Sequence, residues 1–254
     1  IQAGHRACPV GGCVRDSLLG RPPGDWDMCT SARPEELLAL FPRAVPTGGA
    51  HGTVTVPTDS GPVEVTPFRR EGGYSDGRHP DRVAFGASLE EDLARRDFTV
   101  NAMALDENGD IVDLFGGRAD LERGLIRCVG QPEERFREDA LRMLRGVRFA
   151  AQLGFDIERE TLSAMARCAP LAGRVSAERV GAEVEKTLCA PHPDRGAPWF
   201  SLGLLDSYLD RPGRPDLSGL EKLPPEPMAR WAGLCAALLD AGAVEDAAGF
   251  LKHL

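Results

Sequence analysis

Two aspartates near the start of the chain, Asp25 and Asp27, have the type and spacing that most directly indicate chemistry. Segment 25–28, Asp-Trp-Asp-Met, alternates polar and apolar residues as a strand does, so we expect both carboxylates on one face and Trp26 and Met28 in the core. Neighbouring carboxylates repel each other unless a cation lies between them. Hard oxygen ligands of this kind favour Mg²⁺, which also binds substrate phosphates. A solvent-exposed strand face is the alternative interpretation.

A third carboxylate, Glu64, lies in a predicted hairpin. Residues 52–56 and 63–66 are predicted strands, and the Thr-Asp-Ser-Gly segment 58–61 is predicted to turn between them. Glu64 stands between two valines, so its side chain points away from their buried face. If the hairpin lies beside segment 25–28, three carboxylates converge, as in sites where two metal ions assist an attacking hydroxyl and a leaving phosphate. An exposed glutamate on a half-buried strand fits equally well.

A glycine pair, Gly11 and Gly12, lies between a predicted strand at residues 7–10 and a predicted helix at residues 14–19. Glycine lets the backbone approach a ligand closely, and the N–H groups at a helix start suit phosphate oxygens. We therefore expect Gly12 to contact phosphates, with Arg15 adding a positive charge one turn later. A tight turn without any ligand is the alternative.

A second set of charged residues lies in a predicted helix at residues 132–153. Its apolar stripe is formed by Phe136, Ala140, Leu141, Leu144, Val147 and Ala151. Beside this stripe, charged residues recur at every third position: Asp139, Arg142, Arg145 and Arg148. On an ordinary solvated helix face this pattern indicates only an Asp139–Arg142 ion pair.

Asp139 and Arg142 also match the hydrogen-bonding edges of two nucleobases. Cytosine and adenine both present an amino donor beside a ring-nitrogen acceptor, whereas guanine and uracil present a carbonyl beside an N–H. A carboxylate that accepts and a guanidinium that donates therefore fit C and A. A mismatched base leaves buried polar groups unpaired, at about 1–3 kcal/mol per group. The pair is thus predicted to select the base without a nucleic-acid template.

The order of these segments resembles that of a known family. The matching stretches are GGCVRDSLLGRPPGDWD, TGGAHGTVTV, VEVTPFRREGGYSDGRHP, LEEDLARRDFTVNAMA, DLFGGRADLERGLIRCVG and RFREDALRMLRGVRFAAQLGF. Over roughly residues 4–190 the chain resembles the head and neck of the bacterial tRNA nucleotidyltransferases, the class II CCA-adding enzymes of the polymerase-β superfamily. The resemblance implies an α+β fold, a polymerase-β-like nucleotidyltransferase head with a small mixed or antiparallel sheet followed by an all-helical region.

The resemblance also implies three parts: a catalytic head at residues 1–130, a helical neck at 131–190 that binds the base and RNA, and a truncated start of a helical body at 191–254. Compared with the family, the chain begins without the helix expected before the first strand, and Cys8 replaces an expected aromatic residue. The loop at residues 71–82 matches a flexible loop that helps the family change between CTP and ATP. Ser88 and Glu91 form a capping box that opens a predicted helix ending at Arg96. A strand is predicted at 98–105, with a hairpin turn at Asn108 and Gly109.

The implied activity is template-independent addition of CCA to the 3′ end of tRNA, by transfer of CMP and AMP from CTP and ATP with release of pyrophosphate. The implied cofactor is Mg²⁺, held by Asp25 and Asp27, with Glu64 as the third catalytic residue. The implied nucleotide-binding residues are Gly12, Arg15, Arg96, Asp139, Arg142, Arg145 and Arg148. On local grounds Arg96 is equally well explained as a cation at a helix C-terminus. Enzymes that add only C, only A or poly(A) remain alternatives, as does a nucleotide- or RNA-binding fragment without turnover.

Composition sets broader bounds. The 254 residues, 42% of them hydrophobic, are enough for a substantial core, and the net charge of −9 means that RNA contact requires a local basic surface. The seven cysteines show no Cys-x-x-Cys spacing, which favours a reduced cytoplasmic protein over a disulfide framework or a zinc site. We see no membrane-spanning run and no signal peptide, and we expect no membrane or protein partner.

Overall fold

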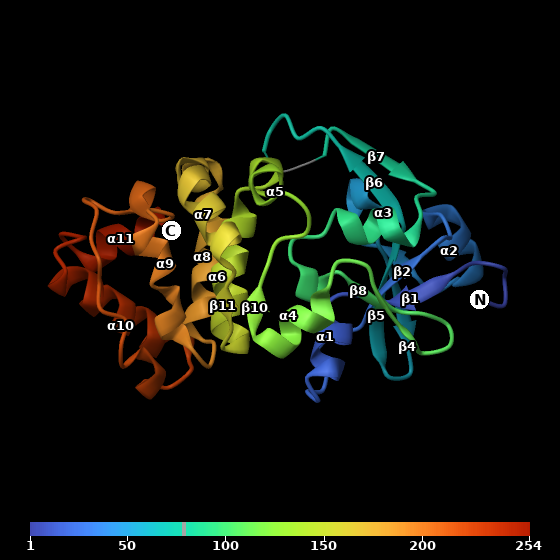
Figure 1. The fold of residues 1–254 in the computed structure, drawn as a ribbon, viewed down its shortest axis with the longest axis horizontal. Helices are drawn as coiled ribbons and strands as arrows, with labels where there is room; N and C mark the ends of the chain where they lie inside the picture. Colours follow the sequence, from blue (N-terminus) through green and yellow to red (C-terminus); the bar gives the residue numbers. More distant parts are fainter. Residues whose placement is uncertain (78–79) are drawn as a thin grey trace. The chain divides into compact units, whose positions relative to one another are not determined.

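The computed structural model describes residues 1–77 and 80–254 (Figure 1). They form two compact units: unit 1 contains residues 1–75 and 80–123, and unit 2 contains residues 76–77 and 124–254. In unit 2, strand β10 (Leu125–Ile126) pairs in parallel with β11 (Asp156–Ile157). Residues just before the head–neck boundary predicted at 130 therefore pack with residues beyond it. The three-part division into 1–130, 131–190 and 191–254 stays a prediction.

Unit 1 is built on a five-stranded mixed sheet, as predicted. Its strands, in spatial order, are β1 (Ala7–Pro9), β2 (Asp27–Thr30), β5 (Gly61–Pro67), β4 (Val54–Thr58) and β3 (Val45–Pro46). β2 and β5 are parallel, and the other neighbouring pairs are antiparallel. The predicted hairpin is confirmed, since β4 and β5 are its two strands.

Two helices cover opposite faces of this sheet. Helix α3 (Leu89–Ala94) places Leu89 and Leu93 in a core cluster with Cys8 and Cys29 of the first two strands. Helix α2 (Pro34–Leu40) places Leu37 in a second cluster with valines of β4 and β5. The predicted capping box at the start of α3 is confirmed: the Glu91 backbone N–H donates to Ser88 Oγ at 3.2 Å. Because α3 is anchored at both its start and its apolar face, the residues that follow it have a defined position.

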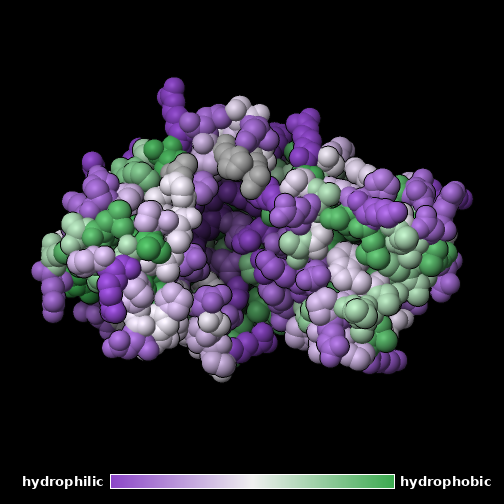
Figure 2. Space-filling view, turned by 180° about the vertical axis from the view of Figure 1, so that it is seen from behind, coloured by the Kyte–Doolittle hydropathy of each residue, from purple (hydrophilic) through white to green (hydrophobic). Residues whose placement is uncertain are grey.

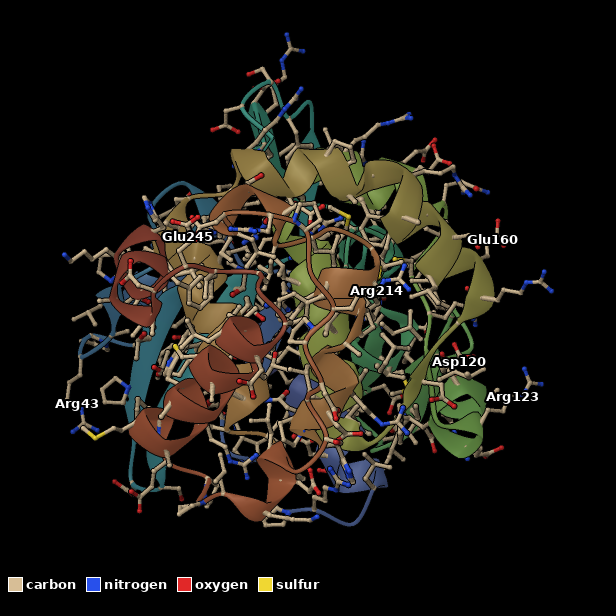
Figure 3. All side chains as sticks on the ribbon, turned by 90° about the vertical axis from the view of Figure 1, so that its left-hand side faces the viewer. Arg43, Asp120, Arg123, Glu160, Arg214 and Glu245 are labelled. Carbon is tan, nitrogen blue, oxygen red and sulfur yellow. The ribbon has the colours of Figure 1, made fainter. Side chains whose placement is uncertain are left out.

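The remaining elements of unit 1 are short. β6 (Arg69–Gly72) pairs with β7 (Arg82–Phe85), and β8 (Met103–Leu105) pairs with β9 (Ile111–Asp113) across the predicted Asn108–Gly109 turn. Within the predicted loop at 71–82, Arg78 and His79 lie outside the described residues. Helix α4 (Gly117–Arg123) holds Asp120, which accepts a 2.5 Å hydrogen bond from Thr99 Oγ1, while Arg123 points outward (Figure 3).

Several predicted boundaries in unit 1 are wrong. The predicted strand at 98–105 begins only at β8, because residues Thr99–Asn101 form a 3₁₀ turn, η2. Helix α1 (Gly12–Leu18) begins two residues earlier than predicted. Segment 25–28 is strand only from Asp27 onward.

The late start of β2 has a cause in its partner strand. The parallel register places Asp27 beside Glu64, so Asp25 would pair with Pro62. Proline has no N–H to donate to a sheet. Asp25 therefore lies in a bend, and Trp26, predicted for the core, is 44% exposed.

Unit 2 is helical apart from β10 and β11, which confirms the predicted all-helical region. Its α-helices are α5 (Pro132–Glu138), α6 (Leu141–Leu153), α7 (Arg159–Cys168), α8 (Ala177–Leu188), α9 (Pro198–Ser201), α10 (Pro227–Asp240) and α11 (Ala247–His253). Short 3₁₀ turns connect them at Ala169–Arg174, Pro193–Gly196, Asp206–Tyr208 and Leu220–Lys222. Helix α6 packs along α8, and the predicted stripe of apolar residues at 136–151 is buried.

The single helix predicted at 132–153 is wrong. It is divided at Asp139, whose backbone is extended with φ −148° and ψ 108°. The Asp139 carboxylate accepts a 3.0 Å hydrogen bond from the backbone N–H of Leu141 at the start of α6. Aspartate favours such local bonds over the helical conformation, which accounts for the break. Asp139 therefore does not belong to the regular row of charged residues that the prediction assumed.

The cysteines, the polarity of the helices and the surface were also subjects of the sequence analysis. All seven cysteines are free thiols, in agreement with the expected absence of a disulfide framework. Within the described parts of the chain, every helix is too short or too polar to cross a lipid bilayer. On the face drawn in Figure 2, hydrophilic residues predominate and hydrophobic ones form separate patches.

Candidate active site

Two of the three predicted catalytic carboxylates lie directly opposite each other in the sheet. Asp27 of β2 and Glu64 of β5 are register partners on parallel neighbours, which lie about 4.8 Å apart. Partners in register point to the same face of a sheet, and both residues are exposed. The hairpin therefore lies beside the aspartate segment, which was stated only as a condition from the sequence.

Asp25 contributes negative charge to the same place. Loss of contact with water raises the pKa of Asp27 above its ordinary value; the positive charge of Arg96 opposes this rise, and the negative charge of Asp25 adds to it. Asp27 is exposed as a residue, but its carboxyl group is partly shielded by neighbouring atoms. The local charge is thus unfavourable for two ionised carboxylates and suits a bound cation.

The three carboxylates lie near one another but do not form a three-residue metal site. Among the described residues, no group of three or more His, Cys, Asp or Glu side chains is placed to hold a metal ion. Asp25 precedes the strand rather than extending it, so it does not lie in register with the other two. Mg²⁺ commonly takes only one or two carboxylates and completes its shell with water and phosphates. Asp25 and Asp27 match that smaller ligand set.

Gly11 is the glycine whose conformation matters at the turn before α1. Its φ of 81° lies in the region that favours glycine, and a Cβ atom there would come within 3.0 Å of Arg96 Nη1. Gly12 has no such constraint, since a Cβ atom would meet Arg15 Nη2 at an ordinary 3.6 Å. The backbone N–H of Val10, next to Gly11, donates to the Asp27 carbonyl at 3.0 Å. The turn therefore brings Gly11, Arg96 and Asp27 together.

Arg15 is a buried cation with fixed orientation. Only 8% of the residue is exposed, and its guanidinium donates to both carboxylate oxygens of Asp16 at 2.8 and 3.0 Å. A further 2.6 Å hydrogen bond reaches Asn101 Oδ1 from the η2 turn. The side chain is thus held beside Gly12, as the sequence predicted for a phosphate-binding arginine.

Arg96 follows α3 and faces the aspartates. Its Nη2 donates to Asp92 Oδ2 at 3.3 Å, and its Nε is buried without a hydrogen-bond partner in the described part of the chain. Its charge also acts on Asp27. An arginine that only capped its own helix would not need this position. The interpretation of Arg96 as a ligand-binding residue therefore gains support over that alternative.

In unit 2, the two residues predicted to select the base do not pair with each other. Asp139 Oδ2 accepts a 2.7 Å ion pair from Arg179 of α8, and Arg142 Nη1 donates to Glu138 Oε2 at 2.6 Å. Glu138 also pairs with Arg135. The simple Asp139–Arg142 ion pair considered from the sequence is therefore wrong. Each residue is instead oriented by its own partner.

The other two arginines of the row have different surroundings. Arg148 is 9% exposed; it pairs with Glu183 of α8 at 2.5 Å and donates to Gln152 at 2.8 Å. Both Arg145 and Arg148 lie over the Phe149 ring, at 5.3 and 4.1 Å from its centroid. Arg148 is thus built into the packing of α6 on α8, a role that its spacing alone did not predict.

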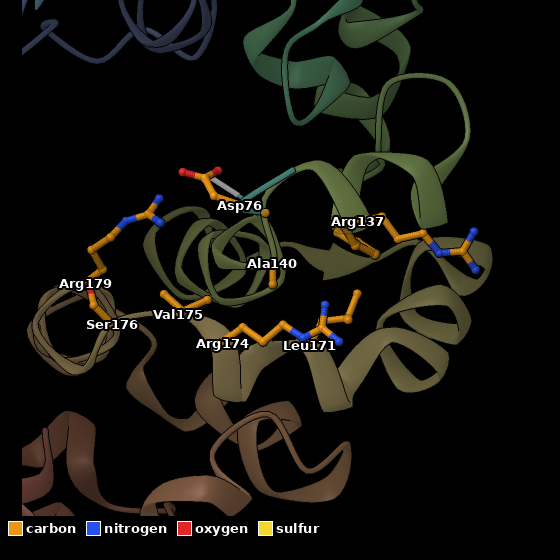
Figure 4. Close-up of a pocket in the computed structure, with 10 residues that line it drawn as sticks. Asp76, Arg137, Ala140, Leu171, Arg174, Val175, Ser176 and Arg179 are labelled. Atoms are coloured by element: carbon orange, nitrogen blue, oxygen red, sulfur yellow. The ribbon is translucent and has the colours of Figure 1, made fainter. Parts of the chain in front are cut away.

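A cavity of about 210 Å³ lies in unit 2, next to the ion-pair partner of Asp139 (Figure 4). Arg179 and Ala140 line it, together with the cationic side chains of Arg137 and Arg174. Arg174 is exposed, and no ion pair is found for it among the described residues. Arg179, the ion-pair partner of Asp139, therefore lines a pocket that three arginines and one acidic residue, Asp76, surround.

Comparison with known proteins supports the assignment of these segments. Residues 8–127 match the family described as the poly A polymerase head domain, and residues 154–198 match one described as a probable RNA- and SrmB-binding site of polymerase A. Residues 8–127 therefore belong to the poly A polymerase head-domain family. The resemblance seen in the sequence is thereby confirmed.

Relatives in this family include two named CCA-adding enzymes. The chain is 46% identical to the one from Geobacillus stearothermophilus over 262 residues, covering 99% of this chain and 63% of that protein. It is 54% identical to the one from Lactiplantibacillus plantarum over 209 residues, covering 82% of this chain and 50% of that protein. This chain therefore spans about half to two thirds of the length of these curated relatives.

Solved structures in the family share the fold. A crystal structure of the Bacillus stearothermophilus CCA-adding enzyme in complex with CTP superimposes with a TM-score of 0.84 at 44% identity, covering 99% of this chain and 62% of that one. The Thermotoga maritima CCA-adding enzyme complexed with tRNA gives a TM-score of 0.66 at 25% identity, covering 82% and 49%. The predicted α+β nucleotidyltransferase fold is confirmed by these matches.

Three contacts of the site were not foreseen from the sequence. Glu138 pairs with Arg142, Arg179 pairs with Asp139, and Asp92 pairs with Arg96. Glu138 lies directly before Asp139 and four residues before Arg142, so its ion pair with Arg142 could have been predicted from the helical spacing. Arg179 lies 40 residues further along the chain, and no periodicity links it to Asp139. Only the packing of separate helices reveals that contact.

Proposed function

We propose that this chain is the head-and-neck part of a CCA-adding enzyme, which transfers CMP and AMP from CTP and ATP to the 3′ end of tRNA and releases pyrophosphate. The observation that carries the proposal is the placement of Asp27 opposite Glu64 on adjacent parallel strands, with Arg96 and the Gly11 turn alongside. The names of the curated relatives support the substrate assignment. The seven free cysteines favour a cytoplasmic location.

The acidic residues suit a divalent cation. Asp25 and Asp27 would hold Mg²⁺. Partial burial raises the pKa of Asp27, and the negative charge of Asp25 adds to this rise, so a bound positive charge would relieve the cost of ionising both carboxylates. When bound, the ion supplies charge stabilisation at the α-phosphate and favours ionisation of the attacking hydroxyl. Glu64 adds a third negative charge on the same sheet face. A cation held by these carboxylates fits a reaction whose rate depends mainly on positioning the reactants and on stabilising the charge that develops on the phosphate.

The cations of unit 1 would hold the triphosphate. Arg15 and Arg96 present guanidinium groups beside the Gly11–Gly12 turn, where a side chain on Gly11 would crowd Arg96. Guanidinium groups bind phosphate oxygens through paired N–H donors. Arg15 is fixed by Asp16 and Asn101, so little conformational freedom is lost when a ligand binds.

Asp139 and Arg142 would choose the base. Their partners, Arg179 and Glu138, orient one carboxylate and one guanidinium without pairing them to each other. A carboxylate offers about four acceptor positions and a guanidinium five donors, so one ion pair each does not exhaust them. The two groups can therefore accept from the amino group and donate to the ring nitrogen of C or A. Arg145 and Arg148 are proposed to support this region.

The experiment that tests the proposal is incorporation of labelled CTP and ATP, separately and together with Mg²⁺, into tRNA ending at the discriminator base. Products are resolved at single-nucleotide length. Two C additions followed by one A support the proposal. Addition of C only, of A only or of a long A tail replaces it with the corresponding restricted activity. Binding of CTP without any incorporation identifies a nucleotide-binding fragment instead.

A further inference from the structure

Asp92 is a fully buried carboxylate in the first turn of α3, with 0% of the residue exposed. Its Oδ1 accepts from Arg95 Nε at 3.0 Å and from Arg95 Nη2 at 2.7 Å. Its Oδ2 accepts from Arg96 Nη2 at 3.3 Å, and the backbone N–H of Arg69 lies 3.4 Å from Oδ1. Burying a carboxylate is unfavourable unless such partners compensate for lost water. One acidic group thus binds two consecutive arginines with different oxygens.

The two arginines depend on Asp92 to different degrees. Arg95 has a second acidic partner, Glu71, at 3.2 Å. Glu71 is itself held by Arg69 at 2.7 Å and by the Tyr74 hydroxyl at 2.6 Å. Among the described residues, Asp92 is the one acceptor found for the Arg96 guanidinium. Loss of Asp92 would therefore release Arg96 while Arg95 keeps a partner.

Arg96 is confined on its other side by the glycine turn. Its Nη1 lies 3.0 Å from where a Cβ atom on Gly11 would be. Its positive charge is felt by Asp27. The guanidinium is therefore held between Asp92 of the α3 helix and the turn that leads into α1. A small shift at Asp92 moves the charge relative to both the turn and the aspartates.

We propose that Asp92 is a positioning residue, which orients the Arg96 guanidinium toward the polyphosphate of the bound nucleotide. This inference rests on the proposed function, since it requires a nucleoside triphosphate at the unit 1 site. Asp92 and Glu71 carry two negative charges against the three positive charges of Arg69, Arg95 and Arg96, so a net positive charge remains for the phosphates. Asp92 itself does not contact the nucleotide.

The test is a double-mutant cycle read out by nucleotide binding to the 254-residue chain. Affinities for CTP and for CMP are measured calorimetrically for the unmodified protein, Asp92→Asn, Arg96→Ala and the double variant. We expect Asp92→Asn to weaken CTP binding about tenfold in the unmodified background and less than about twofold in the Arg96→Ala background. CMP, which lacks the outer phosphates, should bind all four proteins about equally. A purely structural role of Asp92 would weaken both nucleotides.

A matched control is available in the same arginine cluster. Glu71 is also a buried carboxylate bonded to arginines, yet it does not contact Arg96. Glu71→Gln should therefore change CTP affinity less than about twofold. If Asp92→Asn does not fold, Asp92→Glu serves in the same cycle, because it keeps the charge and displaces the carboxylate by one methylene.

The outcomes separate the inference from the proposed function. If the unmodified chain does not bind CTP, or if Arg96→Ala binds it normally, the proposed phosphate role of Arg96 fails and the inference fails with it. If Arg96→Ala is impaired but Asp92→Asn has the same effect in both backgrounds, Asp92 does not act through Arg96. The inference is then overturned while the proposed function stands. Equal loss of CTP and CMP binding in Asp92→Asn also overturns it.

Discussion

The carboxylates of unit 1 and the pair of residues in unit 2 that we propose to select the base are positioned by different means. Asp27 and Glu64 are set by strand register, which fixes where both side chains point. Asp139 and Arg142 lie where one helix ends and another begins, and ion pairs to Arg179 and Glu138 hold their side chains. The backbone thus fixes the groups proposed for chemistry, whereas replaceable side chains fix the groups proposed for specificity.

This difference implies different sensitivity to substitution. A residue fixed by register keeps its position when its side chain is changed, so a substitution there removes chemistry and leaves structure. A residue held by an ion pair is affected both by its own replacement and by replacement of its partner. Variants of unit 1 should therefore separate activity from stability, and variants of unit 2 should show coupling between neighbours.

The largest effect is expected for Asp27→Asn. Removing one of the two carboxylates proposed to hold Mg²⁺ should lower single-turnover incorporation of CMP by on the order of 10²–10³-fold, comparable to loss of one transition-state contact. Unfolding on heating should remain cooperative, because the β2–β5 register does not depend on the carboxylate. Glu122→Gln, an exposed change on α4, is the control. Incorporation at the unmodified rate in Asp27→Asn would remove the catalytic role from β2.

The next largest effect concerns the buried pair of Arg148 and Glu183. Glu183→Ala leaves a buried guanidinium without its 2.5 Å partner, so the free energy of unfolding in urea should fall by about 3–5 kcal/mol. Replacing both residues, as in Arg148→Met with Glu183→Leu, should restore much of this loss, since apolar packing often substitutes well for a buried ion pair.

The same double variant sharpens the assignment of Arg148. If it folds and binds CTP normally, Arg148 supports the packing of α6 on α8 and does not contact the nucleotide. If it folds and CTP binding is lost, Arg148 belongs with the nucleotide-binding residues that the resemblance implied.

The sequence predicted the features that the local backbone determines better than those that depend on contacts between distant side chains. The β4–β5 hairpin and the cap of α3 were predicted because turn residues, alternation and capping are local signals. The Glu64–Asp27 register partnership was foreseen only as a condition. It was correct because Glu64 must point away from the face that buries Val65.

The errors arose where a local pattern competed with an interaction that the pattern does not contain. Trp26 was assigned to the core because the alternation was extended past Asp27, but the absent N–H of Pro62 ends the pairing there. The helix at 132–153 was drawn through Asp139 because its apolar stripe is continuous, although the carboxylate bonds the Leu141 N–H instead. Arg179 was missed because helix packing, not spacing, brings it to Asp139.

A smaller effect, on base preference, tests the pair in unit 2. Arg142→Ala should weaken use of CTP and ATP together by about tenfold and relax the rejection of UTP and GTP, because one buried donor to the base is lost. Incorporation of each of the four nucleotides into tRNA measures this directly. Loss of activity with unchanged base preference would contradict the assignment.

Arg179→Ala extends this test to the partner that orients Asp139. Its ion pair is only partly buried, with side-chain exposures of 22% for Arg179 and 17% for Asp139, so we expect a change of about threefold in the CTP-to-UTP ratio. Arg167→Ala, which removes a more exposed pair with Glu133, is the matched control and should leave the ratio unchanged. Equal effects of the two substitutions would show that Asp139 is not held by Arg179.

The smallest expected effect is a shift in the melting temperature, caused by the carboxyl group of Asp27. Its pKa is higher in the folded chain than the ordinary value of 3.8, so the folded state binds this proton more tightly than the unfolded state does. The stability that the group contributes is therefore present at low pH and lost as pH rises through the folded-state pKa. Asp27→Asn should raise the Tm at about pH 7 by no more than about 4 °C, and the difference should shrink as pH falls toward the ordinary value. Differential scanning calorimetry across this range measures it, with Asp59→Asn in the β4–β5 turn as the control. A lower Tm for Asp27→Asn at neutral pH would mean that the carboxylate stabilises the sheet, and the separation of chemistry from structure in unit 1 would no longer hold.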